Sequence, residues 1–75
     1  MNFPSEEIVR SIKEQYKAGD RVKLVRMDDP YTKIPEGSEG TVRYVDDCGT
    51  IHVSWDCGSS LGVAYGEDEC VLINE

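Results

Sequence analysis

The side chains that could do chemistry in this chain are three cysteines, one histidine and several carboxylates. Cys48, Cys57 and Cys70 are odd in number and form no C-x-x-C pair, so they indicate neither a disulfide framework nor a ribbon-type zinc site. We expect reduced thiols and no cofactor. The three cysteines and His52 would still make a Cys3His set, which is a known structural zinc site. Zinc therefore stays open as an alternative.

The spacing of the cysteines argues against a shared metal ion. Residues 50 to 55 have the pattern of an extended strand, and at about 3.3 Å per residue it would hold the Cα atoms of Cys48 and Cys57 roughly 25 to 30 Å apart. That distance excludes a mutual disulfide. One metal constellation remains, at an end of the fold where two cysteines and three carboxylates would gather: Cys48, Cys70, Asp46, Asp47 and Asp68.

Catalysis would need a nucleophile with a base, paired carboxylates in a cleft, or a metal with an open position. Strand alternation turns His52 away from the apolar side chains of its own segment, which predicts an exposed strand histidine, and Ser54 shares its face without lying close. The acid pairs at residues 28–29 and 46–47 lack a D-x-D-x-D-G pattern and are typical of solvated loops. We predict that the protein is not an enzyme.

The length and composition indicate one small globular domain. At 75 residues, with 39% apolar and 31% charged residues, the chain can hold a single hydrophobic core. The N-terminus has neither a basic start nor an apolar run, and no later stretch approaches membrane-spanning length. We expect a cytoplasmic protein.

The net charge of -7 is unevenly placed along the chain. Residues 1 to 43 carry eight bases and eight acids, whereas residues 44 to 75 carry seven acids and no base. Residues 44 to 75 therefore cannot form a basic surface for a phosphate backbone. Their acidity either serves solubility alone or meets a basic partner protein.

Residues 5 to 18 are predicted to form a helix that begins at the N-cap Ser5 and stops at Gly19. Its apolar stripe recurs every four residues and must contact the rest of the fold: Ile8, Ile12 and Tyr16.

Residues 19 to 75 are predicted to form a small five-stranded SH3-like barrel, so that the fold class is α+β, mainly β, with the helix of residues 1–18 in front. Alternating apolar residues and tight turns give the expected strands: 21–25, 41–45, 50–55, 60–64 and 70–73. A long loop with Pro30 and Pro35 follows the first strand, hairpin turns lie at 46–49 and 56–59, and Trp55 is expected in the core.

Several short motifs resemble a family of small bacterial and phage proteins catalogued as domain of unknown function 4314. These motifs are the start F-P-S at residues 3–5, M-D-D-P-Y at 27–31, W-D-C-G-S-S at 55–60 and Y-G-E-D at 65–68. The resemblance covers nearly the whole chain. It implies a family and no activity.

A looser likeness joins G-x-x-V at residues 19–22, G-T-V at 40–42 and V-x-W-D-x-G-S at 53–59. This combination is similar to the Mib/Herc2 domains, SH3-like barrels of ubiquitin ligases that bind short peptide segments of partner proteins. Members of both families often have Asn where this chain has Cys57. The ligase context is not implied, because nothing else of a ligase is present.

The resemblance to SH3-like barrels implies a ligand site between the long first loop and the next hairpin turn. Exposed aromatic and acidic residues there are the predicted partner-binding set: Asp28, Asp29, Tyr31, Tyr44, Asp46, Asp47, Asp56, Tyr65, Glu67 and Asp68. Aromatic anchors within a polar rim are typical of protein interfaces. The alternative is that Tyr31 and Tyr65 only cover the barrel ends.

The leading hypothesis is a non-catalytic protein-binding module, encoded by a phage or mobile element, that docks its acidic surface on a basic partner protein. One concrete form is an inhibitor of a host nucleic-acid-binding enzyme such as a defence nuclease. A second hypothesis, nucleic-acid binding, would use the bases of the helix and first strand: Arg10, Lys13, Lys17, Arg21, Lys23 and Arg26. A zinc-stabilised domain is the third.

Overall fold

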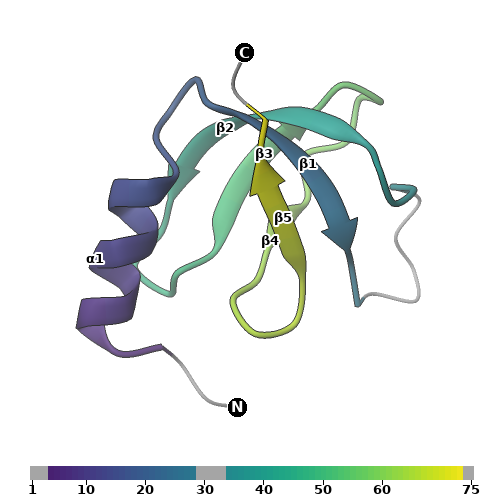
Figure 1. Ribbon diagram of the computed structural model, residues 1–75. Helices are drawn as coiled ribbons and strands as arrows, with labels where there is room; N and C mark the ends of the chain where they lie inside the picture. Colours follow the sequence, from purple (N-terminus) through teal and green to yellow (C-terminus); the bar gives the residue numbers. More distant parts are fainter. Residues whose placement is uncertain (1–3, 29–33, 74–75) are drawn as a thin grey trace.

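The computed structural model describes residues 4–28 and 34–73, and it has one helix followed by five antiparallel strands in that part of the chain (Figure 1). The elements follow one another in this order: α1 (Glu6–Gln15), β1 (Arg21–Arg26), β2 (Glu39–Val45), β3 (Ile51–Trp55), β4 (Gly62–Val63) and β5 (Glu69–Leu72). The predicted class, mainly β with one N-terminal helix, is confirmed. Among the described residues, no helix is long and apolar enough to cross a membrane.

Helix α1 begins where the sequence predicts it, directly after Ser5. The Ser5 hydroxyl accepts a hydrogen bond from the amide of Ile8 at 3.3 Å, which satisfies one free donor of the first turn. The helix ends at Gln15, earlier than the predicted residue 18, because Tyr16 has an extended backbone with φ -118° and ψ 103°.

The chain makes a separate turn after Tyr16 and does not continue the helix. The Asp20 carboxylate accepts a hydrogen bond from the amide of Lys17 at 3.0 Å, and Gly19 has a φ of +95°. Gly19 therefore belongs to the turn into β1 and does not stop the helix itself. The prediction of residue 18 as the end of the helix missed the local bond made by Asp20.

The five strands form an open sheet in the order β4-β3-β2-β1-β5. The predicted closure into a barrel is not found. β4 contains only Gly62 and Val63, and among the described residues it pairs with β3 alone. The two edge strands, β4 and β5, therefore do not pair with each other.

Tyr16, the residue directly after α1, contacts the free edge of β5. The amide of Ile73 donates to the carbonyl of Arg21 at 2.9 Å, so the backbone groups of Cys70 and Leu72 point away from β1. At this edge the Tyr16 hydroxyl donates to the carbonyl of Cys70 at 3.3 Å. Tyr16 thus takes a place that a neighbouring strand would have in a closed barrel.

The core lies between the concave face of the sheet and α1. Alternation along β3 buries Ile51, Val53 and Trp55, as the sequence predicts, and the indole Nε1 of Trp55 donates to the carbonyl of Leu61 at 2.9 Å. The buried apolar residues come from every element: Val9, Ile12, Val22, Leu24, Ile34, Val42, Ile51, Val53, Trp55, Val63 and Cys70.

Candidate functional site

Most of the predicted binding residues gather at one end of the sheet, beside the β2–β3 turn (residues 46–50) and the β4–β5 loop (residues 64–68). They are Asp28, Tyr44, Asp46, Asp47, Tyr65, Glu67 and Asp68. Asp56 lies at the opposite end of β3. Asp29 and Tyr31 fall outside the described residues.

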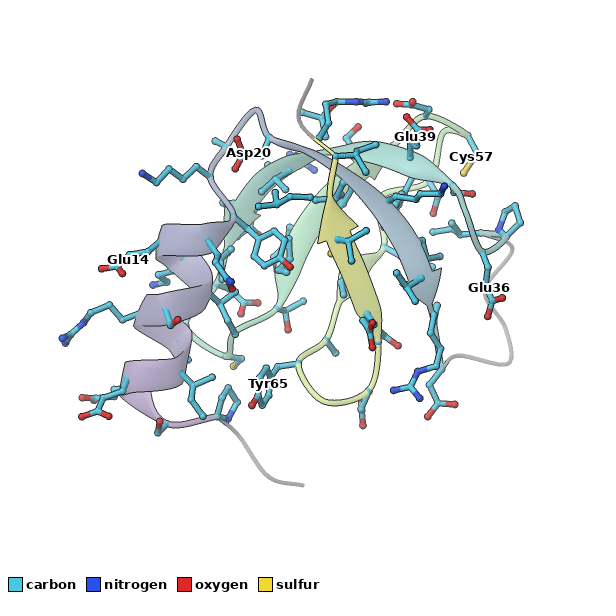
Figure 2. All side chains as sticks on the ribbon, in the orientation of Figure 1. Glu14, Asp20, Glu36, Glu39, Cys57 and Tyr65 are labelled. Carbon is cyan, nitrogen blue, oxygen red and sulfur yellow. The ribbon has the colours of Figure 1, made fainter. Side chains whose placement is uncertain are left out.

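A groove of about 300 Å³ opens at this end between α1 and the β4–β5 loop. Its floor consists of buried apolar side chains from three elements, Ile12, Ile51 and Val63. Tyr16 stands on the helix side and Tyr65 on the loop side, and Figure 2 shows Tyr65 extending from the loop toward α1. The open seam of the sheet therefore carries an apolar hollow between two aromatic rings.

The β4–β5 loop is held in shape by Asp68. Its Oδ2 accepts the amide of Ala64 at 2.9 Å, and its Oδ1 accepts the amide of Asp28 at 2.8 Å. The amide of Asp68 also donates to the carbonyl of Ala64 at 2.9 Å. These bonds tie the loop to the end of the segment that follows β1, so Tyr65 projects from a fixed support.

The β2–β3 turn is organised by Asp46. Its Oδ1 accepts the amides of Cys48 and Thr50 at 2.9 and 3.0 Å, and its Oδ2 lies 2.8 Å from Nε2 of His52. Burial raises the pKa of Asp46, but the hydrogen bonds from His52 and the two amides outweigh it, so the pKa lies below its ordinary value. Asp46 is therefore a carboxylate at neutral pH, which can accept a hydrogen bond from Nε2 of His52.

His52 lies on the face opposite Ile51 and Val53, as expected, but it is half-buried and not exposed. The Tyr44 ring stacks on its imidazole with the ring centroids 4.4 Å apart and the planes 12° from parallel. Tyr44 faces His52 across the strand pair because a register shift between Val42 and Tyr44 places the two residues opposite each other. This shift has no sequence signal in the strand pattern, which explains why the stacking was not predicted.

The same turn is fastened to α1. The ammonium of Lys13 lies 2.7 Å from the Asp47 carboxylate on the surface. Beneath it Gly49 has a φ of +81°, and a Cβ at this position would lie 3.0 Å from Cγ of Pro4 and 3.4 Å from Cδ1 of Ile12. Gly49 is thus required both for the turn and for the close approach of the helix.

At the other end of the sheet, Asp56 is bound by Arg21 through two hydrogen bonds of 3.0 and 2.6 Å. Arg21 also donates to Thr41 at 3.0 Å and lies 3.6 Å from Glu39. The hydrogen bond from Arg21 is the main cause of the lowered pKa of Asp56, and it raises the pKa of Arg21 in turn. This cluster joins β1, β2 and the β3–β4 turn.

The cysteines do not converge. Cys48 and Cys57 are exposed in the turns at opposite ends of β3, and Cys70 is buried in β5 with its thiol pKa raised to about 11 by burial and by the charge of Glu69. Across residues 4–28 and 34–73, no group of three or more His, Cys, Asp and Glu side chains is placed to hold a metal ion. The predicted constellation around Cys48 and Cys70 is therefore not brought together there.

Three residues that line the groove are absent from the predicted binding set: Ile12, Tyr16 and Glu69. Ile12 and Tyr16 were recognised as an apolar helical stripe, but nothing in their spacing told which part of the sheet they meet. Glu69 also lines the groove, together with Asp68 and a single base from the described residues, Arg26. The run of acids at residues 67–69 was the available signal for Glu69.

A family model described as Domain of unknown function (DUF4314) matches residues 5–73. The chain belongs to this family. The DUF4314 match spans α1 and the β4–β5 loop, so both walls of the groove are part of the family's domain. Among the curated proteins, no match is found.

Proposed function

We propose that this DUF4314 protein is a non-catalytic protein-binding module that docks an acidic surface on a basic partner protein. The observation that carries the proposal is the exposed pair Glu67 and Glu69: Glu69 lines the groove, and Glu67 lies between two lining residues, Gly66 and Asp68. Neither makes an ion pair within the described residues. Their charge is therefore available to a partner.

The other carboxylates of the region already have partners inside the protein. Asp46 holds His52 and its own turn, Asp47 binds Lys13, and Asp68 accepts two backbone amides. These residues shape the surface and add negative potential, since the whole chain has a net charge of -7. Glu67 and Glu69 are the acids that a basic partner meets directly.

Two further parts of the proposal rest on the resemblances. The strand order, with β5 beside β1 at one edge, fits an opened relative of an SH3-like barrel. The resemblance to small bacterial and phage proteins supports a phage or mobile-element origin, and a host nucleic-acid-binding enzyme such as a defence nuclease is a partner with the required basic surface.

The geometry gives less support to nucleic-acid binding. Two of the six candidate bases are engaged by acids, Lys13 by Asp47 and Arg21 by Asp56. A phosphate backbone would have to compete with these carboxylates and with the negative charge of residues 44–75.

A pull-down with the full chain followed by an affinity series at rising ionic strength tests the proposal. The captured protein should be basic, and its affinity should fall as the salt concentration rises to about 0.15 M. The double variant Glu67→Gln and Glu69→Gln should weaken binding, whereas the matched helix variant Glu7→Gln and Glu14→Gln should not. An affinity that does not change with salt, or equal effects of both double variants, would contradict the proposal.

A further inference from the structure

We infer that the groove between α1 and the β4–β5 loop receives one large apolar side chain of the partner, from a segment in which basic residues flank that side chain. This inference rests on the proposed function and specifies which side chains of the partner the surface recognises. It is carried by the floor, the walls and the rim of the groove.

The floor of the groove admits an apolar group and excludes a charged one. Ile12, Ile51 and Val63 are at most 8% exposed, and the described residues contain no buried polar or charged side chain. A lysine or arginine head group on this floor would lose its water without gaining a carboxylate, which is costly. The side chain that enters is therefore apolar, and the cations of the partner stay at the rim.

The walls are two tyrosines with different roles. Tyr16 is fixed by its hydrogen bond to the carbonyl of Cys70. Tyr65 is 50% exposed, and its hydroxyl makes no hydrogen bond within the part of the chain that the structure describes. A half-exposed aromatic ring on a loop held by the hydrogen bonds of Asp68 costs less entropy to bury than one on an untethered loop, which makes Tyr65 the expected anchor residue of the interface.

The rim selects the residues on either side of the apolar group. Asp68 and Glu69 line the groove against one base, Arg26, and Glu67 adds a further negative charge next to them. The volume of about 300 Å³ lies at the lower end of the range of ligand pockets, so a single side chain fits better than an extended ligand. A short basic segment with one apolar residue satisfies both conditions.

Chemical-shift titration of the ¹⁵N-labelled full chain tests this inference with three capped pentapeptides. The first has leucine flanked by two basic residues on each side, the second has alanine in place of leucine, and the third has leucine flanked by glutamates. We expect the first to shift the amides of Gly49, Tyr65, Gly66 and Cys70. It should bind about tenfold more tightly than the second, and the third should not bind.

Two exposed side chains, Tyr65 and Val71, provide a pair of variants. Tyr65→Ala should weaken binding of the leucine peptide by about tenfold, as expected for an anchor residue. Val71→Ala truncates an apolar side chain of β5 that is 41% exposed and does not line the groove, and it should change the affinity by less than about twofold.

The remaining outcomes separate this inference from the proposed function. The basic peptides could bind in a salt-dependent way with an affinity that depends neither on the leucine nor on Tyr65. That result would overturn the inference but would remain consistent with the acidic docking function. Absence of binding by any basic peptide at millimolar concentration would count against both. Shifts of the groove amides that grow with protein concentration alone would assign the groove to a second copy of the chain and overturn the inference.

Discussion

Nε2 of His52 and Oδ2 of Asp46 lie 2.8 Å apart, and this contact closes the β2–β3 turn over the third strand. The same carboxylate accepts the amides of Cys48 and Thr50. One side chain thus joins the turn to the only histidine of the chain. Its removal should loosen the turn that faces α1.

Substitution Asp46→Asn should lower the free energy of unfolding at pH 7 by about 1 kcal/mol, because the amide cannot replace the charged acceptor of the His52 bond. The pKa of Asp46 is lower in the folded protein than in the unfolded chain, so its carboxylate stabilises the fold above about pH 4. That stabilisation is lost as the pH falls through the folded-state pKa. Urea unfolding from neutral to acid pH should therefore show the difference between the two proteins shrinking below about pH 4.

Asp47 provides the control for this measurement. Its side chain is 98% exposed and makes only the surface ion pair with Lys13, so Asp47→Asn should cost less than about 0.5 kcal/mol. An equal loss in both variants, or a difference for Asp46→Asn that persists at strongly acid pH, would show that the His52 bond does not stabilise the turn.

Substitution Gly49→Ala should destabilise the protein more than Gly58→Ala. Both glycines have a positive φ, which costs an alanine about 1 kcal/mol. At Gly58 an added Cβ meets nothing within 4 Å, whereas at Gly49 it lies 3.0 Å from Pro4 and 3.4 Å from Ile12. We expect about 2 to 3 kcal/mol for Gly49→Ala in urea unfolding. Equal losses of unfolding free energy would contradict this prediction, because they would mean that α1 shifts to accommodate the added Cβ without loss of stability.

The three thiols should react at very different rates. Burial raises the pKa of the Cys70 thiol to about 11, so at pH 8 this thiol is almost wholly protonated. It is also buried, whereas Cys48 and Cys57 are exposed. With a colorimetric disulfide reagent, two thiols should react fast in the native protein and the third only in denaturant. The variant Cys48→Ser with Cys57→Ser should show almost no native reactivity. Rapid modification of Cys70 in that variant would contradict its placement.

Tyr16→Phe should lower the free energy of unfolding by about 1 kcal/mol, because it leaves the Cys70 carbonyl without its donor at the edge of β5. Burial raises the pKa of Tyr16, so its hydroxyl keeps the proton throughout the neutral range. The matched variant Tyr65→Phe removes a hydroxyl that makes no hydrogen bond within residues 4–28 and 34–73. It should leave the midpoint of urea unfolding unchanged, and equal shifts for both variants would refute the role assigned to the Tyr16 hydroxyl.

Local signals predicted most of the fold. The N-cap at Ser5 and the alternation of Ile51, Val53 and Trp55 depend on neighbours in the sequence, and both are confirmed. Closure of the barrel depends instead on whether two distant edges meet. That outcome is decided by the shortness of β4 and by the position of Tyr16, neither of which a strand pattern reveals.

The candidate site was predictable only in part, for the same reason. Turn-forming acids such as Asp46 and Asp68 were recognised as residues near a surface, but their hydrogen bonds inside the protein depend on tertiary contacts. Ile12 and Tyr65 are far apart in the sequence. They line one groove only because α1 lies beside the β4–β5 loop in the folded chain.

The cover that Tyr16 gives to β5 also bears on association between molecules. A strand edge with free amides and carbonyls is a template on which a strand of another copy can pair, and natural proteins protect such edges. Here the protection comes from Tyr16, the residue that follows α1, through its bond to the Cys70 carbonyl. A variant without residues 4–16 would leave that carbonyl free and uncover the apolar floor of the groove. It should aggregate through edge-to-edge pairing, so Tyr16 limits association at the edge of β5 as well as forming one wall of the groove.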